Sequence, residues 1–440
     1  MTQVVSGTRT LSVEVLSRVE GEGAMHVTVD GDVVRDVELR IFEPPRFFEA
    51  LLRGRAYTEP PDITARICGI CPVAYQISSV QAIEDACGVT VPDDIRALRR
   101  LLYCGEWIES HGLHIYLLHA PDFLGYPSAI HLATDHREIV QRGLDMKKVG
   151  NDLVDLVGGR AIHPINVRLG GFYRAPRRDE LAGLVEPLRR AADQAEETAR
   201  WVNGFAFPDV ERDYEFVALS DPDGRYPIDT GRVVSSSGVD VPVQEFSEHF
   251  VEYHVARSTA LHSRTAGAAS EDEGHYHVGP LARWALNRDR LSPRCLALAD
   301  ELGVPAVVRN PFRSVVVRAI ETLYACEEAL RIVDSYTPPA EPAIAVPARA
   351  GTGHGVSEAP RGLLYHRYRI DGEGTITDAV ITPPTAQNLP TIEDDLRAVV
   401  QANLALDDEA LRLLSEHAIR NYDPCISCST HFLRLTIDRR

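Results

Sequence analysis

Two pairs of cysteines with the same C-x2-C spacing lie near opposite ends of the sequence. Cys68 and Cys71 form the first pair, and Cys425 and Cys428 form the second. Cysteine thiolates are the soft ligands that bind zinc, nickel, low-valent iron or metal clusters. Because C-x2-C spacing lets both sulfurs of one turn reach one metal, two pairs can complete a four-sulfur shell. We therefore expect a single metal centre that the rest of the fold serves to close.

A structural zinc ion bound by four cysteines is the alternative interpretation of this pattern. Zinc ribbons and fingers normally place their two pairs within tens of residues, because the metal replaces a missing core. A chain of 440 residues has ample core of its own. A redox C-x2-C motif would need only one pair and would leave the other unexplained. The remaining cysteines are isolated in helical or apolar stretches, as small buried hydrophobic residues are, and lie at positions 87, 104, 295 and 326.

Composition excludes several classes of protein. Hydrophobic residues make up 44% of the chain and charged residues 25%, as in ordinary globular proteins. The net charge of −18 argues against a nucleic-acid or anionic-membrane partner, since both need basic patches. No apolar run is long enough for a membrane span, and the N-terminus lacks the features of a secretory signal. A cytoplasmic location is therefore expected.

Hydrophobic periodicity predicts an α+β fold that is mainly helical, with β hairpins near both ends of the chain. The first hairpin spans 11–42 and turns at Asp30-Gly31, and the second pairs 363–370 with 375–381. A β excursion is expected over about 214–243, and a proline-rich connector over 337–350. We treat 1–431 as a single domain. Helices are predicted over 46–53, 78–87, 93–119, 179–203, 247–262, 311–335 and 392–417.

The two cysteine motifs belong to a longer series. Arg-x-Cys-Gly-x-Cys near the N-terminus and Asp-Pro-Cys-x-x-Cys-x-x-His near the C-terminus resemble the signatures of the large subunit of NiFe hydrogenases. Other segments of this chain resemble further signatures of that family in the same order: 18–21, 48–55, 358–362 and 384–389. The resemblance thus covers nearly the whole chain. Cys-Pro-Val-Ala-Tyr after the first pair, with the short length, is most similar to the cytosolic, NAD(P)-coupled bidirectional and sulfhydrogenase branch.

The resemblance implies a role for each thiol. Cys68 and Cys425 would be terminal ligands of nickel. Cys71 and Cys428 would bridge nickel to an iron that carries carbonyl and cyanide ligands. Heterolytic cleavage of H2 also needs a base near the metal, and Glu20 in Arg-Val-Glu-Gly is the residue that the family places beside the terminal cysteine of the C-terminal pair.

Further residues would shape the pocket around the iron. Arg361 is expected above the iron, with Asp423 as its partner, because a buried arginine without an anion is costly. Pro360 and Thr385 would line the pocket and meet the cyanides. Two positions depart from the family pattern: Ser110 stands where some relatives have an acid, and Tyr75 stands where many relatives have a histidine. A tyrosine hydroxyl can donate a similar hydrogen bond but cannot become positively charged near neutral pH.

A second, hard cation is implied near the C-terminus. Glu49 and His431 resemble the ligands of a magnesium or similar ion, with the backbone carbonyl of Leu389 as the third protein contact. Residues 432–440 would be a maturation peptide, which a protease removes once nickel is loaded, or alternatively a short permanent strand. Three histidines of the predicted core helix are expected to be satisfied core residues and not metal ligands, namely His111, His114 and His119.

The resemblance implies a catalytic subunit of a soluble NiFe hydrogenase, which interconverts H2 with protons and electrons. No C-x2-C-x2-C run is present to hold a cluster relay, so electrons would leave through a partner iron–sulfur small subunit. Diaphorase-type subunits would then couple the reaction to NAD(P), and a maturation protease and nickel chaperones would act on the chain. The alternatives are a non-catalytic structural homologue of the family, which would lack the four cysteines, and a structural zinc protein.

Overall fold

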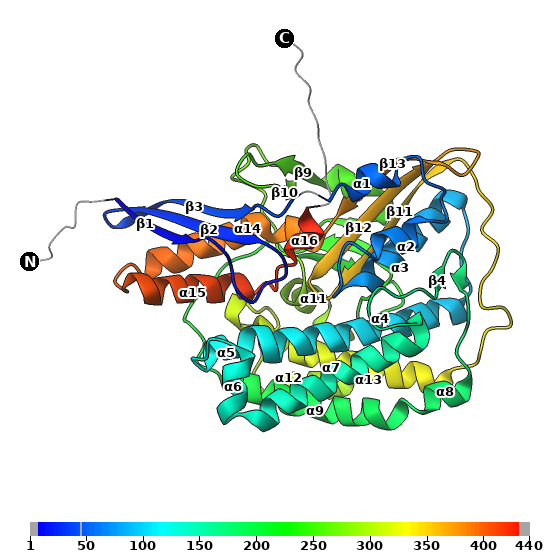
Figure 1. The fold of residues 1–440 in the computed structure, drawn as a ribbon, viewed down its shortest axis with the longest axis horizontal. Coiled ribbons are helices and arrows are strands. Elements are labelled where there is room, and N and C mark those ends of the chain that lie inside the picture. The colour runs from blue at the N-terminus through cyan, green and yellow to red at the C-terminus, as the bar shows by residue number, and fades with distance from the viewer. Residues whose placement is uncertain (1–7, 45, 431–440) are drawn as a thin grey trace, which may run out of the picture.

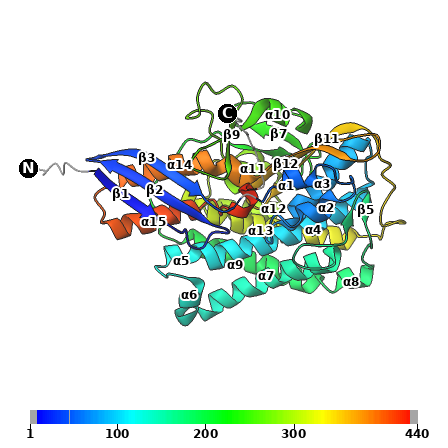
Figure 2. The same ribbon diagram turned by 45° about the horizontal axis from the view of Figure 1, so that its top comes forward.

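A computed structural model describes residues 8–44 and 46–430. Long helices lie side by side along one side of the molecule, and antiparallel sheets lie on the other side (Figures 1 and 2). The long helices are α4 (Asp93–Leu113), α7 (Arg137–Gly158), α9 (Val185–Asn203) and α13 (Ser314–Ser335). Helices α4 and α13 are buried over most of their surface, so they form the centre of the core. No helix among the described residues is long and apolar enough to cross a membrane.

The N-terminal sheet contains the predicted hairpin. Strands β2 (Gly23–Asp30) and β3 (Val33–Ile41) pair in antiparallel fashion, and β1 (Thr8–Val13) adds a third strand beside β2. Alternate residues of these strands point into a separate hydrophobic core, which they share with α14 (Pro384–Ala402) and α15 (Asp408–Arg420). The sheet therefore fixes the position of the segment that precedes β2 and contains Glu20.

The second sheet packs on helix α3 (Pro72–Cys87), which follows the first cysteine pair. Strands β11 (Gly351–Ala359), β12 (Gly362–Ile370) and β13 (Ile376–Thr382) lie in this order. The hairpin of β12 and β13 agrees with the prediction. A Cβ atom on Gly353 would lie 2.1 Å from the carbonyl oxygen of Ala82, and one on Gly355 would lie 2.0 Å from that of Ser78. The glycines of β11 thus allow this strand to touch the helix backbone.

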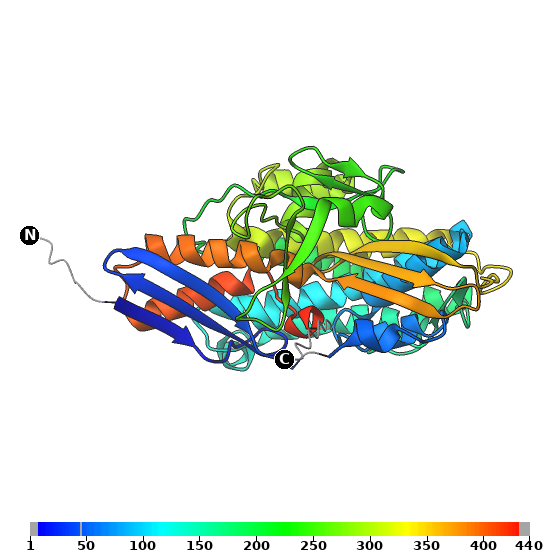
Figure 3. The same ribbon diagram turned by 90° about the horizontal axis from the view of Figure 1, so that it is seen from above.

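The short helix that contains Cys428 lies between these two sheets (Figure 3). Figure 3 shows the N-terminal sheet in blue and the C-terminal sheet in orange, with the short helix α16 (Ile426–Ser429) in red between them.

The remaining elements are α1 (Phe48–Leu52), α2 (Pro60–Thr64), a π-helical turn (His114–His119), α5 (Ala120–Phe123), α6 (Ala129–Asp135), β4 (Val167–Arg168), β5 (Gly171–Phe172), α8 (Arg178–Ala182), β6 (Val217–Ser220), β7 (Arg232–Ser235), β8 (Asp240–Val241), α10 (Phe246–His249), β9 (Phe250–His254), β10 (Leu261–Thr265), α11 (Pro280–Asn287) and α12 (Pro293–Glu301), with 3-10 turns at Val243–Glu245, Arg288–Arg290 and Pro311–Arg313.

Some predicted elements are wrong. Residues 247–262 form no long helix, because this stretch contains the end of α10, all of β9 and the start of β10. Its aromatic and β-branched residues at 250, 251 and 253 favour a strand. The predicted helix over 392–417 is two helices, since the side chain of Asp407 accepts a hydrogen bond from the backbone N–H of Ala410 and starts α15 there. Helices α7, α11 and α12 were not predicted.

Candidate metal centre

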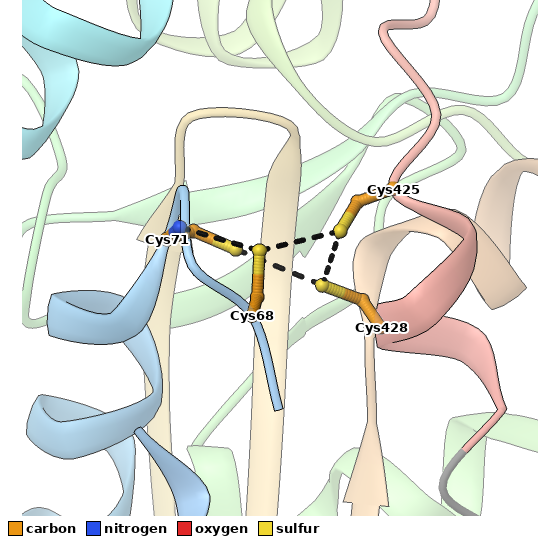
Figure 4. A group of neighbouring side chains, drawn as sticks. All are labelled: Cys68, Cys71, Cys425 and Cys428. Atoms are coloured by element: carbon orange, nitrogen blue, oxygen red, sulfur yellow. Dashed lines mark hydrogen bonds between the residues drawn. The ribbon is translucent and has the colours of Figure 1, made fainter. Parts of the chain in front are cut away.

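The four thiols of the two C-x2-C pairs meet in the interior, as the sequence led us to expect (Figure 4). The Sγ atoms of Cys68 and Cys425 lie 3.4 Å apart, those of Cys71 and Cys428 3.7 Å apart, and those of Cys425 and Cys428 2.6 Å apart. All four Sγ atoms lie within 4.8 Å of one another. Each cysteine is free and buried, and 357 positions separate Cys68 from Cys425. The site therefore brings together sulfur atoms from two distant segments of the chain.

Backbone groups hold the first cysteine pair in a tight turn. The N–H groups of Ile70 and Cys71 donate to the Sγ of Cys68 at 3.2 and 3.4 Å. Helix α3 begins directly after Cys71, and two N–H groups of its first turn donate to the carboxyl oxygens of Glu106 on α4, at 2.6 and 3.1 Å. Glu106 thus accepts hydrogen bonds from N–H groups at the start of α3, which would otherwise be buried without partners. Glu106 was not predicted from the sequence, although an acid in an apolar core helix is a recognisable signal.

The electrostatics of the thiols fit a bound cation. Hydrogen bonds from Cys425, Cys428 and Cys71 lower the pKa of the Cys68 thiol well below its usual range. Burial raises the pKa values of Cys425 and Cys428 well above theirs. Several thiolates cannot be buried together without a compensating positive charge. A soft metal ion supplies this charge and releases the thiol protons, so the donor set fits nickel together with iron.

Glu20 contacts the C-terminal cysteine pair directly. Its Oε2 atom accepts a hydrogen bond from the Cys425 thiol at 3.0 Å and another from the backbone N–H of Ser427 at 3.0 Å. The backbone carbonyl of Glu20 accepts from the N–H of Ile426 at 2.8 Å. Gly21 has a φ of +87°, and a Cβ there would lie 2.8 Å from the Cβ of Ile426. Glycine is thus needed for this close approach.

Arg361 and Asp423 form a buried ion pair beside the thiols. The Nε of Arg361 donates to the backbone carbonyl of Asp423 at 2.6 Å, and its Nη2 lies 3.1 Å from the Asp423 carboxylate. Burial alone would lower the pKa of Arg361, but Asp423 and the neighbouring thiols raise it well above its usual range. The Nη1 of Arg361 has no hydrogen-bond partner among the described residues. This amino group is therefore available to an additional acceptor.

The other predicted pocket residues are all buried. The hydroxyl oxygen of Thr385 accepts a hydrogen bond from the backbone N–H of Cys425 at 3.0 Å. Pro360 lies in the turn between β11 and β12, directly before Arg361. Tyr75 is buried, and burial together with the adjacent Cys428 raises its pKa well above the usual range, so the phenol stays neutral. Ser110 is buried, and its hydroxyl has no hydrogen-bond partner within the part of the chain that the structure describes.

The predicted cation site is described only in part. Glu49 is buried in α1, where its carboxylate accepts a hydrogen bond from the backbone N–H of Ile381 at 2.8 Å and burial raises its pKa to about 7. Leu389 is buried in α14, and His431 lies outside the described residues. A further acid, Glu252, was not predicted. Burial raises its pKa to about 8, and the charge of Glu49 contributes to this increase.

One histidine differs from our expectation. The Nε2 of His114 is hydrogen-bonded to the carbonyl of Arg420 at 2.8 Å, and His111 lies 3.1 Å from the carboxylate of Glu321. His119, however, is fully buried and neither of its ring nitrogens has a hydrogen-bond partner among the described residues. The expectation of a satisfied core residue is therefore wrong for His119, which contacts other rings instead.

This fold and the buried thiols from two distant segments define the large subunit of a NiFe hydrogenase. The family model for nickel-dependent hydrogenases matches residues 46–142 and 272–431, and the chain belongs to this family. It is 33% identical to sulfhydrogenase 1 subunit alpha of Pyrococcus furiosus over 97% of this chain and 98% of the relative. Sulfhydrogenase 2 subunit alpha of the same organism is 35% identical over 97% of this chain and its own full length.

Solved structures agree with this assignment. The structure described as an NAD+-reducing NiFe hydrogenase in the H2-reduced state superimposes with a TM-score of 0.87 and 28% identity, over 96% of this chain and 99% of that one. The NAD-reducing hydrogenase HoxS subunit beta of Cupriavidus necator is 27% identical over 97% of this chain and 95% of the relative. Both the family and the fold class that the sequence predicted are therefore confirmed.

Proposed function

We propose that this large subunit catalyses the reversible conversion of H2 into two protons and two electrons at a nickel–iron centre bound by its four cysteines. In this proposal the thiolates of Cys68 and Cys425 would bind nickel, and those of Cys71 and Cys428 would bind both nickel and iron. The single observation that carries the proposal is the contact between Cys425, one of the four clustered thiols, and the carboxylate of Glu20 at 3.0 Å. A zinc site with a purely structural role needs no such base.

The metals, when bound, supply the electrophile that polarises H2. The chain's own contribution is to hold a proton acceptor beside them. Cys425 takes the proton first and passes it to Oε2 of Glu20, in a step that breaks an S–H bond and forms an O–H bond without moving electrons. Because Thr385 and Ile426 fix the backbone on either side of Cys425, the donor and acceptor keep this separation.

The iron in this proposal carries carbonyl and cyanide ligands. Arg361 would hold a cyanide through its Nη1, which has no hydrogen-bond partner among the described residues, while its other nitrogens bind Asp423. Pro360 and Thr385 would line the rest of this pocket, and Tyr75 would donate a hydrogen bond to a bridging sulfur. A charged, forked donor in a dry pocket suits small anionic ligands.

The hard cation would be bound by Glu49, by the carbonyl of Leu389 and by His431. The buried carboxyl groups of Glu49 and Glu252 support this assignment, because burial raises their pKa values to about 7 and about 8. A magnesium ion at this place would stabilise the ionised form of both groups.

Electrons would leave through an iron–sulfur small subunit and reach NAD(P) through diaphorase-type subunits. This part of the proposal is supported by relatives that are named as subunits of NAD-reducing and sulfhydrogenase enzymes. We further propose a cytoplasmic location, a single domain over 1–431, maturation with nickel chaperones, and removal of 432–440 by a protease after metal insertion.

The test is infrared spectroscopy and metal analysis of the protein purified with its native partners. Nickel is expected, together with more iron than nickel because the partner's iron–sulfur clusters also contain iron, and absorption bands of metal-bound carbonyl and cyanide are expected beside them. A Cys425→Ser variant should lose nickel and these bands. Zinc in place of nickel in the unmodified protein, with no such bands, would overturn the proposal and favour a structural site.

A further inference from the structure

Arg18, Asp122 and Arg420 form a buried ionic cluster. Two of its members lie on the segments that contain Glu20, the proposed proton acceptor, and Cys425. Arg420 forms a forked contact with the Asp122 carboxylate, with Nε to Oδ2 at 2.7 Å and Nη2 to Oδ1 at 2.8 Å. The Nη2 of Arg18 donates to the same Oδ1 atom. The side chains of Asp122 and Arg420 are only 7% and 1% exposed. Each buried charge therefore depends on the others for compensation.

The cluster joins three segments of the chain. Arg18 lies two positions before Glu20, Arg420 lies five positions before Cys425, and Asp122 belongs to α5. The Nη1 of Arg420 also donates to the carbonyl of Ser17 at 2.9 Å. The segment that contains Glu20 and the segment that contains Cys425 are therefore both attached to the carboxylate of Asp122.

The backbone of Arg18 is strained, and the contacts of its side chain stabilise this strained conformation. Its φ of +58° lies in the left-handed region, which costs a non-glycine residue about 1–3 kcal/mol. The side chain is held at both ends of its guanidinium, by Asp122 and by the carbonyl of Leu118 at 2.8 Å. A left-handed conformation of this kind persists only where neighbouring contacts stabilise it. It sets the direction of the backbone two positions before Glu20.

A metal site is the competing interpretation of this region. Ligand atoms of His119, Asp122 and His417 lie within 4.8 Å of one another. Both carboxylate oxygens of Asp122, however, are already bound by guanidinium groups. The charges of Arg18 and Arg420 are balanced by Asp122 and by Glu416, which lies 3.2 Å from Arg420. A divalent cation would add two uncompensated positive charges to a buried place, so the geometry favours the ionic cluster.

We propose that Asp122 is a positioning residue for proton transfer, which holds Glu20 within hydrogen-bonding distance of Cys425 through Arg18 and Arg420. This inference rests on the proposed function, in which the Cys425 proton moves to Glu20. Asp122 itself touches neither group. A displacement of about 1 Å between a proton donor and its acceptor lowers reaction rates by up to a hundred-fold. The effect of Asp122 on the position of Glu20 can therefore be measured as a change in rate.

The test compares Asp122→Asn with Glu20→Gln in the complete, metal-loaded enzyme. Asp122→Asn keeps the shape of the side chain and removes the charge that holds both arginines. We expect unchanged nickel and iron content and unchanged infrared bands, a fall in H2 oxidation of at least about ten-fold, and a larger solvent deuterium isotope effect. Asp229→Asn is the matched control, because Asp229 is also buried and paired with an arginine, at 3.1 Å from Arg100. Its isotope effect should not change.

The outcomes separate the two proposals. If Glu20→Gln leaves H2 oxidation and isotope exchange intact, the proposed proton step itself is wrong. If Glu20→Gln is impaired but Asp122→Asn keeps the wild-type rate and isotope effect, the positioning role is overturned. If Asp122→Asn does not assemble, Arg18→Lys replaces it, since lysine keeps the charge and cannot hold Asp122 and Leu118 together. The larger isotope effect is again expected, and an unchanged one overturns the inference.

Discussion

The carboxylate of Glu20 accepts a hydrogen bond from the thiol of Cys425 at 3.0 Å, across 405 positions of sequence. Glu20→Gln keeps the size of this side chain but removes its ability to take a proton. We expect H2 oxidation to fall by roughly a hundred-fold or more, the usual contribution of a positioned acid or base, while metal content is retained. Hydrogen–deuterium exchange with D2 gas, measured beside metal analysis, checks this prediction. A fully active Glu20→Gln enzyme would contradict it.

Arg361→Lys should impair the enzyme even though the positive charge remains. One ammonium group cannot reproduce both contacts with Asp423 and also direct a donor where Nη1 now points. Loss of one charge-assisted hydrogen bond, worth about 2 kcal/mol, corresponds to a rate reduction of roughly thirty-fold. The cyanide bands should shift as well. Arg367→Lys on β12, the strand that follows Arg361, is the control, because Arg367 pairs with Asp378; this variant should leave both rate and bands unchanged.

Glu106 is expected to support the first cysteine pair through helix α3. Glu106→Ala would leave two buried N–H groups of α3 without acceptors, at a cost of roughly 2–5 kcal/mol in the free energy of unfolding. Glu106→Gln keeps one carbonyl oxygen as an acceptor for these N–H groups, whereas its amide NH2 group can only donate. Glu106→Gln should therefore retain more stability and more nickel than Glu106→Ala. Thermal unfolding and nickel analysis of both variants test this order, and equal losses would contradict it.

Asp395 should make stability depend on pH. Burial raises its pKa to about 6, although Tyr214 and Tyr422 both donate to it at 2.7 Å. The unfolded chain loses this proton near pH 4, so the folded state binds more protons between about pH 4 and pH 6. Its contribution to stability is therefore present at low pH and is lost as the pH rises through about 6, with a total of at most about 3 kcal/mol.

An Asp395→Asn variant isolates this effect. The difference in unfolding free energy between wild type and variant should move in favour of the variant from pH 4 to pH 6 and stay constant above. Denaturant titrations at several pH values give this difference, in which the other ionisable groups cancel. A difference that does not change with pH would show that the carboxyl titrates normally.

Local sequence patterns predicted the parts of the site that lie within short motifs. Cys68 and Cys71 lie in one turn, and Asp423 lies two positions before Cys425, so each pair of residues falls within a motif that can be recognised in the sequence. Asp122 and Glu252 were missed because each is the one acid of a short element, α5 or β9, and only tertiary packing brings it to its partners. The wrong helix over 247–262 has a similar cause, since its pairing of β9 with β10 depends on neighbours that periodicity does not contain.

The separation of the two cysteine pairs also sets an order of events during synthesis. Cys68 emerges from the ribosome early, but the thiols that meet it are added 357 positions later. Until then the first pair can offer a metal only two sulfurs, which a stray zinc or copper ion could occupy. A cell that makes this protein must therefore keep the half-built site free of the wrong metal throughout translation, and correct loading depends on when the metal is delivered as much as on which atoms bind it.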